Sequence, residues 1–194
     1  MSEESIRKEY ERYGAEQYYR RFGARYRNPH EAAVRLAIHS AATAWGLDLS
    51  HVLDLACGSG EVTLALREEI GWQDQPAWRE RGTAVIEGVD PYTGTAYGAR
   101  TGQVAEALSF EAIAGGALDG RRYSLIVCSY ALHLLAPSRL PRLAYQLSRI
   151  SGVLLVLTPH KRPDLRPEWG WRLTGEMIVE RVRVRRYISG GLYV

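Results

Sequence analysis

The segment 51–66, HVLDLACGSGEVTLAL, combines an acid, a glycine-containing turn and the start of a helix. Asp54 lies in an apolar run that indicates a buried strand. A tight turn then runs from Ala56 to Gly60, and a helix begins near Glu61. Glycines let the backbone of such a turn approach a ligand closely, and the free N–H groups of a helix start add a small positive field. The pattern predicts a ligand-binding turn.

The residues of this turn also discriminate between ligands. A dinucleotide site would carry a third glycine in a G-x-G-x-x-G pattern, and Thr63 stands in that place. Asp54 puts a carboxylate in the turn, where it would repel a pyrophosphate but suit a ligand with an ammonium or sulfonium charge. The turn therefore favours S-adenosylmethionine (SAM) over NAD.

Strands and helices alternate along most of the chain, which positions this turn at a sheet edge. We expect strands at 51–56, 84–90, 109–114, 123–130 and 152–159, and helices at 31–45, 61–70, 93–103 and 138–150. Such alternation is typical of parallel strands with helices on both faces. The sequence predicts a Rossmann-like, doubly wound α/β sheet, mostly parallel.

The last third of the chain departs from this alternation. The segment 177–188, MIVERVRVRRYI, has period two, with Val182 and Val184 on one face and Arg181, Arg183 and Arg185 on the other. A strand with one wet face belongs at a sheet edge, so we expect an antiparallel C-terminal edge strand. Gly190 and Gly191 would then turn the chain into a last partner strand at 192–194.

Three motifs together suggest a family. DLACGSG resembles motif I of the class I SAM-dependent methyltransferases, VIEGVD resembles the family's acid-ending second strand, and YSLIVCSYALHLL is similar to the segment that closes its cofactor site. They follow one another in the family's order over roughly 50–160. The resemblance implies a methyltransferase with SAM as cofactor and S-adenosylhomocysteine (SAH) as product.

The resemblance also implies cofactor contacts. Asp90 would hold the ribose, because a carboxylate can accept hydrogen bonds from both hydroxyls; a turn-capping role for Asp54 and Asp90 is the alternative. The expected contacts in the core are Asp54, Ala56, Cys57, Gly58, Gly60, Asp90, Pro91, Tyr92, Ala114, Gly115, Cys128 and Ser129.

An N-terminal helical arm, 1–45, precedes the core, 46–194, in what we expect to be a single domain. Many relatives place a lid over the cofactor here, so Tyr18, Tyr26, Asn28 and His30 are lid candidates, the first three as cofactor contacts. The alternative is that the aromatic side chains of the arm pack on the outside of the sheet.

Tyr130, His133 and His160 are the candidate catalytic residues. His133 could act as a base near the methyl group or cap the following loop. His160 lies in the stiff, electropositive loop 158–163, which contacts the substrate or is solvated. The histidines lack ligand spacing with acids, so we expect no catalytic metal.

The family's adenine-binding acid after the third strand is missing, because Ala114 and Gly115 offer only backbone there; Ser124 replaces another usual acid. The proline pair of amino-methylating relatives is absent as well. This argues against exocyclic-amine methylation of DNA or RNA and against glutamine methylation. These absences do not identify the acceptor, which we expect to be a small molecule or a protein side chain.

Two alternatives remain open. The net charge of +3 is too mild to imply a nucleic-acid partner. Cations nevertheless gather late in the chain and could serve an RNA or polyanion methyltransferase, or form a solvated edge strand; they are Lys161, Arg162, Arg181, Arg183 and Arg185. The second alternative is an inactive SAM-binding partner subunit, since the family's final hairpin looks cut short.

The two cysteines, Cys57 and Cys128, make neither a disulfide framework nor a zinc site. The charged N-terminus lacks the apolar core of a secretory signal, and no run approaches the ~18 apolar residues of a membrane span. We expect a soluble protein in the reducing cytoplasm, or in the nucleus, with no membrane partner.

Overall fold

The computed structural model describes residues 14–71 and 84–190. Within these residues, six strands form one sheet in the order β2-β1-β3-β4-β6-β5. The strands are β1 (His51–Leu55), β2 (Val85–Val89), β3 (Leu125–Ser129), β4 (Val153–Thr158), β5 (Trp171–Val179) and β6 (Val182–Ser189). Strands β1 to β4 pair in parallel, and the β5–β6 hairpin joins β4 antiparallel. The predicted Rossmann-like sheet is confirmed.

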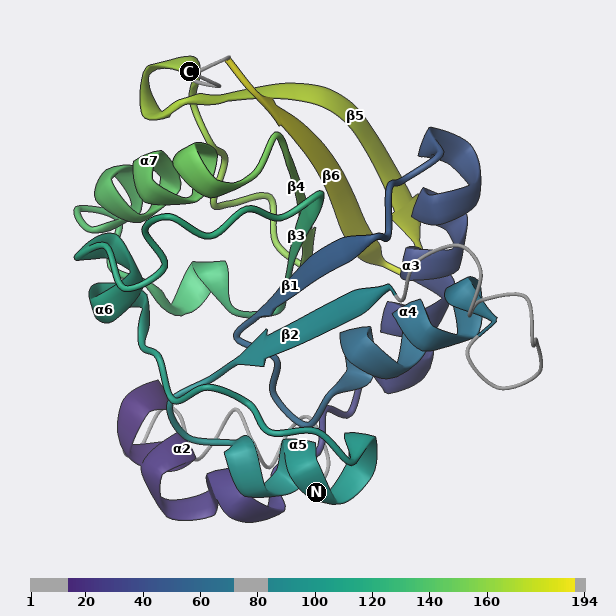
Figure 1. Cartoon of the computed structure of the whole chain (residues 1–194), viewed down its shortest axis with the longest axis vertical. Coiled ribbons are helices and arrows are strands. Elements are labelled where there is room, and N and C mark those ends of the chain that lie inside the picture. Colours follow the sequence, from purple (N-terminus) through teal and green to yellow (C-terminus); the bar gives the residue numbers. More distant parts are fainter. Residues whose placement is uncertain (1–13, 72–83, 191–194) are drawn as a thin grey trace.

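Helices cover both faces of the sheet (Figure 1). They are α2 (Ala15–Phe22), α3 (Glu31–Trp45), α4 (Glu61–Ile70), α5 (Gly94–Thr101), α6 (Phe110–Ala114) and α7 (Leu140–Ile150), with short 3-10 turns η1 (Gly23–Arg25), η3 (Leu132–Leu134) and η4 (Pro167–Trp169). In Figure 1, α6 and α7 lie on one side and α3 and α4 on the other, while α2 and α5 lie below β2.

The core has two parts because the central strands are apolar on both faces. Along β1, Leu53 packs with residues of α7 such as Leu143. Its neighbour Val52 points the other way and packs with Ile38 of α3 and Leu66 of α4. All five side chains are buried. This packing fixes the sheet, and with it the polar residues at the strand ends, such as Asp54 and Asp90.

Most expected elements are present with ends trimmed by one or two residues. Helices α3 and α4 have the expected bounds, and the expected strands at 51–56, 84–90, 123–130 and 152–159 correspond to β1, β2, β3 and β4. No helix in the described part of the chain is both long enough and apolar enough to cross a membrane.

The segment 109–114 is a helix, and the predicted strand there is wrong. The Ser109 side chain accepts a hydrogen bond from the Ala112 N–H (3.2 Å) and so caps α6. Glu111 in the first turn favours the same structure. A short apolar run cannot by itself separate a strand from one helical turn. The edge of β2 is instead met by a single bridge between Val89 and Glu106.

The predicted antiparallel C-terminal edge is confirmed. The expected single strand at 177–188 is wrong, because this segment spans the turn between two strands. The chain reverses at Glu180 and Arg181, whose φ angles are 46° and 66°, as a two-residue hairpin turn requires. Strand β5 is therefore the edge, and β6 lies inside the sheet. Strands β5 and β6 pair from Trp171↔Ser189 to Val179↔Val182. The expected partner strand at 192–194 lies outside the described residues.

Candidate functional site

A cavity of about 420 Å³ lies at the carboxyl ends of β1, β2 and β3, beneath α2. Ligands of open α/β sheets bind at this edge. Its wall includes Glu16 and Tyr19 of α2, Tyr26 and Asn28, the turn Asp54–Gly58 with Glu61, Asp90–Tyr92 after β2, Leu108–Glu111, Ser129–Ala131 after β3, and Leu134–Ala136 with Arg139.

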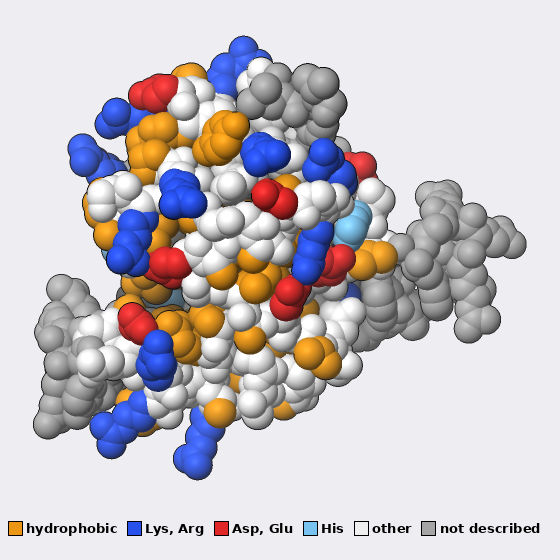
Figure 2. Space-filling model, turned by 60° about the vertical axis from the view of Figure 1, so that its left-hand side comes forward, with side chains coloured by type: hydrophobic (Ala, Val, Ile, Leu, Met, Phe, Trp, Pro, Cys, Tyr) orange, Lys and Arg blue, Asp and Glu red, His pale blue; other side chains and the backbone are white. Residues whose placement is uncertain are grey.

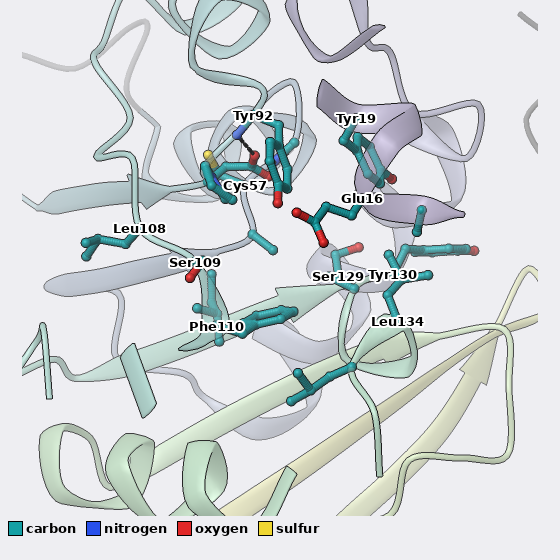
Figure 3. A pocket seen from close by; sticks show the side chains of 18 of the residues that line it. Glu16, Tyr19, Cys57, Tyr92, Leu108, Ser109, Phe110, Ser129, Tyr130 and Leu134 are labelled. Atoms are coloured by element: carbon teal, nitrogen blue, oxygen red, sulfur yellow. Dashed lines mark hydrogen bonds between the residues drawn. The ribbon is translucent and has the colours of Figure 1, made fainter. Parts of the chain in front are cut away.

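Tyr19 and Glu16 of α2, together with Tyr92 after β2, shape the mouth of this cavity (Figure 3). The rings of Tyr19 and Tyr92 are nearly parallel, at 11° with centroids 6.4 Å apart. Glu16 reaches from α2 toward the middle of the cavity, with Phe110 on the opposite side. The cavity thus offers flat apolar surfaces together with negative charge.

The structure brings most of the predicted site residues together. The predicted residues in the cavity wall are Tyr26, Asn28, Asp54, Ala56, Cys57, Gly58, Asp90, Pro91, Tyr92, Ser129 and Tyr130. The predicted residues outside the wall are Tyr18, Gly60, Ala114, Gly115, Cys128, His133 and His160.

The residues outside the wall have other surroundings. Ala114 and Gly115 lie at the end of α6, because 109–114 is helical rather than a strand that ends at the cavity. Cys128 is buried in the apolar core, and Tyr18 is buried with its ring against those of Tyr19 and Phe22. At Gly60 a Cβ would lie 2.5 Å from the Thr101 side chain, so this glycine lets α5 pack against the turn.

Asp54 is almost completely buried, at 1% exposure, and caps α4. Its Oδ2 accepts hydrogen bonds from the Thr63 N–H (3.1 Å) and the Thr63 hydroxyl (2.7 Å). Burial raises the pKa of Asp54 to about 7, and the charges of Glu61 and Asp90 act in the same direction. Thr63, which breaks the dinucleotide pattern, is therefore the partner of the turn acid.

Asp90 joins two turns at the cavity wall. Its Oδ1 accepts hydrogen bonds from the N–H groups of Tyr92 (2.8 Å) and Thr93 (3.0 Å), and its Oδ2 accepts one from the Gly58 N–H (3.3 Å). The carboxylate thus caps a turn, as the alternative reading expected, and it also borders the cavity.

Glu61 is a cavity residue that sequence reasoning missed, since an acid in the first turn of a helix is usually explained by the helix dipole. It is 5% exposed. Its Oε1 accepts hydrogen bonds from the Arg100 guanidinium (2.9 Å), the Asn28 N–H (3.3 Å) and the Ser59 hydroxyl. Two segments far apart in sequence therefore meet on one carboxylate beside the cavity.

The arm residues Tyr26 and Asn28 cover the turn after β1. Asn28 is 7% exposed, and its Oδ1 accepts a hydrogen bond from the His30 N–H (2.9 Å) in a local turn. A Cβ at Gly58 would lie 3.2 Å from the Tyr26 ring. This position of the arm favours the lid interpretation over packing on the outside of the sheet.

Of the three candidate catalytic residues, Tyr130 alone borders the cavity. Its φ of 54° is unusual for an aromatic residue, and its ring stacks on His30 with centroids 4.7 Å apart. His133 and His160 contact each other edge to face, also at 4.7 Å. Burial, with the neighbouring His160, lowers the pKa of His133 to about 4. Catalytic roles for these residues stay predictions.

Two of the basic residues of β6 form ion pairs within the hairpin. Arg183 and Arg185 both pair with Glu176. Arg185 is 6% exposed and also donates to the backbone oxygens of Lys161 (2.7 Å) and Pro163 (2.8 Å). This guanidinium therefore holds the loop 161–163 against β6. Binding of an anionic partner through these residues stays a prediction.

Figure 2 shows Lys and Arg side chains dispersed over the face that carries α6 and α7, with acidic and apolar side chains between them. Among the residues that the structure describes, no group of His, Cys, Asp and Glu is arranged to hold a metal ion.

Comparison with known sequences gives one informative relative. No protein-family model matches the chain. An uncharacterized protein of Schizosaccharomyces pombe, C17A5.05c, is 34% identical over 92% of this chain and 90% of its own length. The similarity extends over nearly the whole of both proteins.

Comparison with solved structures identifies the fold. The N-methyltransferase NodS from Bradyrhizobium japonicum WM9, in complex with SAH, matches 90% of this chain and 98% of its own with a TM-score of 0.64 and 13% identity. Magnesium protoporphyrin IX methyltransferase (ChlM) from Synechocystis PCC 6803, with bound SAM, matches 98% of both chains with a TM-score of 0.58 and 14% identity.

Proposed function

Because the chain belongs to the same family as C17A5.05c of S. pombe and has the fold of class I SAM-dependent methyltransferases, we propose that it transfers a methyl group from SAM to an acceptor. The observation that carries this proposal is the acid-lined cavity at the glycine turn. SAM, when bound, supplies a methyl group on a sulfonium. The chain's own residues would position the reactants and exclude water, which accounts for much of the rate of such a displacement.

The cavity suits SAM in shape and charge. Gly58 has a φ of 55° and leaves open a space that a Cβ would fill, between Tyr26 and Glu61. Glu16, Glu61 and Asp90 border the cavity. Carboxylates attract the sulfonium and ammonium groups of SAM and would repel the pyrophosphate of NAD.

Particular residues would take particular parts of the cofactor. Asp90 would accept hydrogen bonds from the ribose hydroxyls. Tyr92 and Phe110 would enclose the adenine, in place of the predicted Ala114 and Gly115. Ser129, whose buried Oγ has no hydrogen-bond partner among the described residues, would lie beside the methyl group.

The proposed acceptor is a small molecule or a protein side chain. The cavity opens between α2 and the start of α7, where Glu16, Tyr92 and Arg139 line a second, shallower pocket. Because acids and arginines both line this pocket, it suits a compact acceptor better than a polyanion. The pairing of Arg183 and Arg185 with Glu176 also supports this choice.

Thermal unfolding with SAM, SAH and NAD tests the cofactor. A ligand at ~100 times its dissociation constant adds about 2.7 kcal/mol, which is roughly 5–10 °C for a chain of this size. We expect this shift with SAM and SAH and none with NAD. The absence of a shift with both sulfur ligands would refute the proposal. Release of SAH in a panel of amine, hydroxyl and carboxylate acceptors then tests the transfer.

A further inference from the structure

The two oxygens of the Glu61 carboxylate have different surroundings. Oε1 accepts all three hydrogen bonds, from Arg100, Asn28 and Ser59. Oε2 receives none from the described residues, and it lies 3.3 Å from the position of a Cβ at Gly58. The contacts to Oε1 fix the side chain, so Oε2 is held at the cavity as a free acceptor.

The Asn28 side chain presents the complementary group. Its Oδ1 is used by the His30 N–H, and its amide nitrogen has no acceptor among the described residues. Asn28 is only 7% exposed, and it borders the same cavity as Glu61. This amide nitrogen is therefore a donor that a ligand in the cavity can use.

The charge near Glu61 is negative on the cavity side. Arg100 bridges Glu61 and Glu31, and Arg27, the further partner of Glu31, is 71% exposed and therefore screened by solvent. The group Glu31–Arg100–Glu61 keeps one net negative charge. A cationic group of a ligand would be attracted to the free oxygen of Glu61.

We propose that Glu61 and Asn28 recognise the α-amino-acid end of the ligand, with Glu61 Oε2 accepting from its ammonium group and the Asn28 amide donating to its carboxylate. This assignment rests on the proposed function, because SAM and SAH carry such an end. The turn acid Asp54 is the competing candidate, but its carboxylate is more deeply buried and already caps α4 through Thr63.

The test compares SAH with 5′-methylthioadenosine, which has the adenosine and the thioether but no amino-acid end. In Glu61→Gln the amide oxygen keeps the three donors of Oε1, so the amide nitrogen faces the cavity and meets the ammonium donor to donor. We expect the affinity for SAH to fall about tenfold or more, and that for methylthioadenosine to change less than about twofold, by calorimetry.

Asn28→Asp gives a second, independent variant. The new carboxylate can still accept from the His30 N–H, while its other oxygen repels the ligand carboxylate. Its loss of affinity should again be confined to SAH. Glu31→Gln is the matched control, because Glu31 binds the same Arg100 but lies outside the cavity wall; both ligands should bind it nearly as they bind the wild type.

The outcomes separate this inference from the proposed function. Equal weakening of both ligands by Glu61→Gln, or unchanged binding of SAH, overturns the inference while methyl transfer stands. Selective loss of SAH in Asp54→Asn but not in Glu61→Gln assigns the ammonium to Asp54 and overturns it as well. A wild-type protein that binds neither ligand refutes the proposed function itself.

Discussion

Asp90 is placed to serve both the fold and a ligand, and the two roles can be separated. In Asp90→Asn the amide oxygen can still accept from the N–H groups of Tyr92 and Thr93. The amide nitrogen cannot accept a hydrogen bond from a ribose hydroxyl. We expect the affinity for SAH to fall at least about tenfold, while the lost hydrogen bond from the Gly58 N–H lowers the free energy of unfolding by only about 1–3 kcal/mol. Calorimetry and urea unfolding measure both. Unchanged affinity would show that the ribose does not bind here.

Asp54 gives a prediction about pH. Its pKa is raised from an ordinary value of 3.8 to about 7 in the fold, so the folded chain holds this proton more tightly than the unfolded chain. The stability it contributes is full below about pH 4 and declines as the pH rises toward 7. Urea unfolding at pH 5 and pH 8 should show a larger loss for the wild type than for Asp54→Asn, by up to about 3 kcal/mol.

Asp54→Asn is informative because an amide oxygen can still accept from the Thr63 N–H and hydroxyl, while the charge is removed. Parallel pH profiles for the two proteins would mean that Asp54 ionises in the fold as easily as in water. If the unfolding free energy of the variant fell more steeply with pH than that of the wild type, the fold would stabilise the ionised form of Asp54 instead of the protonated form.

Individual site residues differ in how far sequence reveals them. Asp90 and Gly58 can be predicted, because an apolar run fixes where a strand ends and the polar residue after it must lie at the sheet edge. Glu61 cannot, because its inward orientation depends on Arg100 and Asn28, which come from segments distant in the sequence. The signal available was an acid directly after the glycine turn.

At the scale of elements, the contact between η1 and the turn after β2 determines how the arm covers the cavity. At Gly23 a Cβ would lie 2.5 Å from the Tyr92 carbonyl oxygen. The φ of Gly23 is −55°, so alanine adds a clash without backbone strain. Gly23→Ala should displace the arm and weaken SAH binding about fivefold or more, while the core stays folded.

Gly14→Ala is the control for that experiment. Gly14 precedes α2 and has a φ of 76°, but a Cβ there meets nothing within 4 Å. Equal weakening of SAH binding in both variants would attribute the effect to the stability of α2 instead of its contact with Tyr92. Hydrogen exchange over Ala15–Phe22 would show which explanation holds.

Elements could be predicted where one periodicity is sustained. Helices α3 and α4 have apolar residues at helical spacing over several turns, and the central strands are continuous apolar runs. The errors occur where a local feature decides: the Ser109 cap that turns a six-residue run into α6, and the reversal at Glu180 and Arg181, which lack the usual glycine or asparagine of a hairpin turn.

At the scale of the whole molecule, the cavity and the rest of the surface differ in charge. The net charge is +3, yet the cavity is bordered by several acids, and arginines outside it such as Arg121 and Arg183 are paired with carboxylates. A positive total therefore does not amount to a continuous positive surface, and Figure 2 shows the same dispersion on the face that it presents. A polyanion would find few neighbouring free cations on that face.

This distribution predicts weak binding to polyanions. We expect the protein to elute from heparin at or below about 0.15 M salt, because few phosphate-like groups can be neutralised at once and the remaining attraction is screened. Retention beyond about 0.5 M salt, lost when Lys161, Arg162 and Arg181 are replaced by alanine, would contradict this expectation. It would place an anion-binding surface on the loop 161–163 and the hairpin turn beside it, and an RNA acceptor would then become the leading candidate for the methyl group.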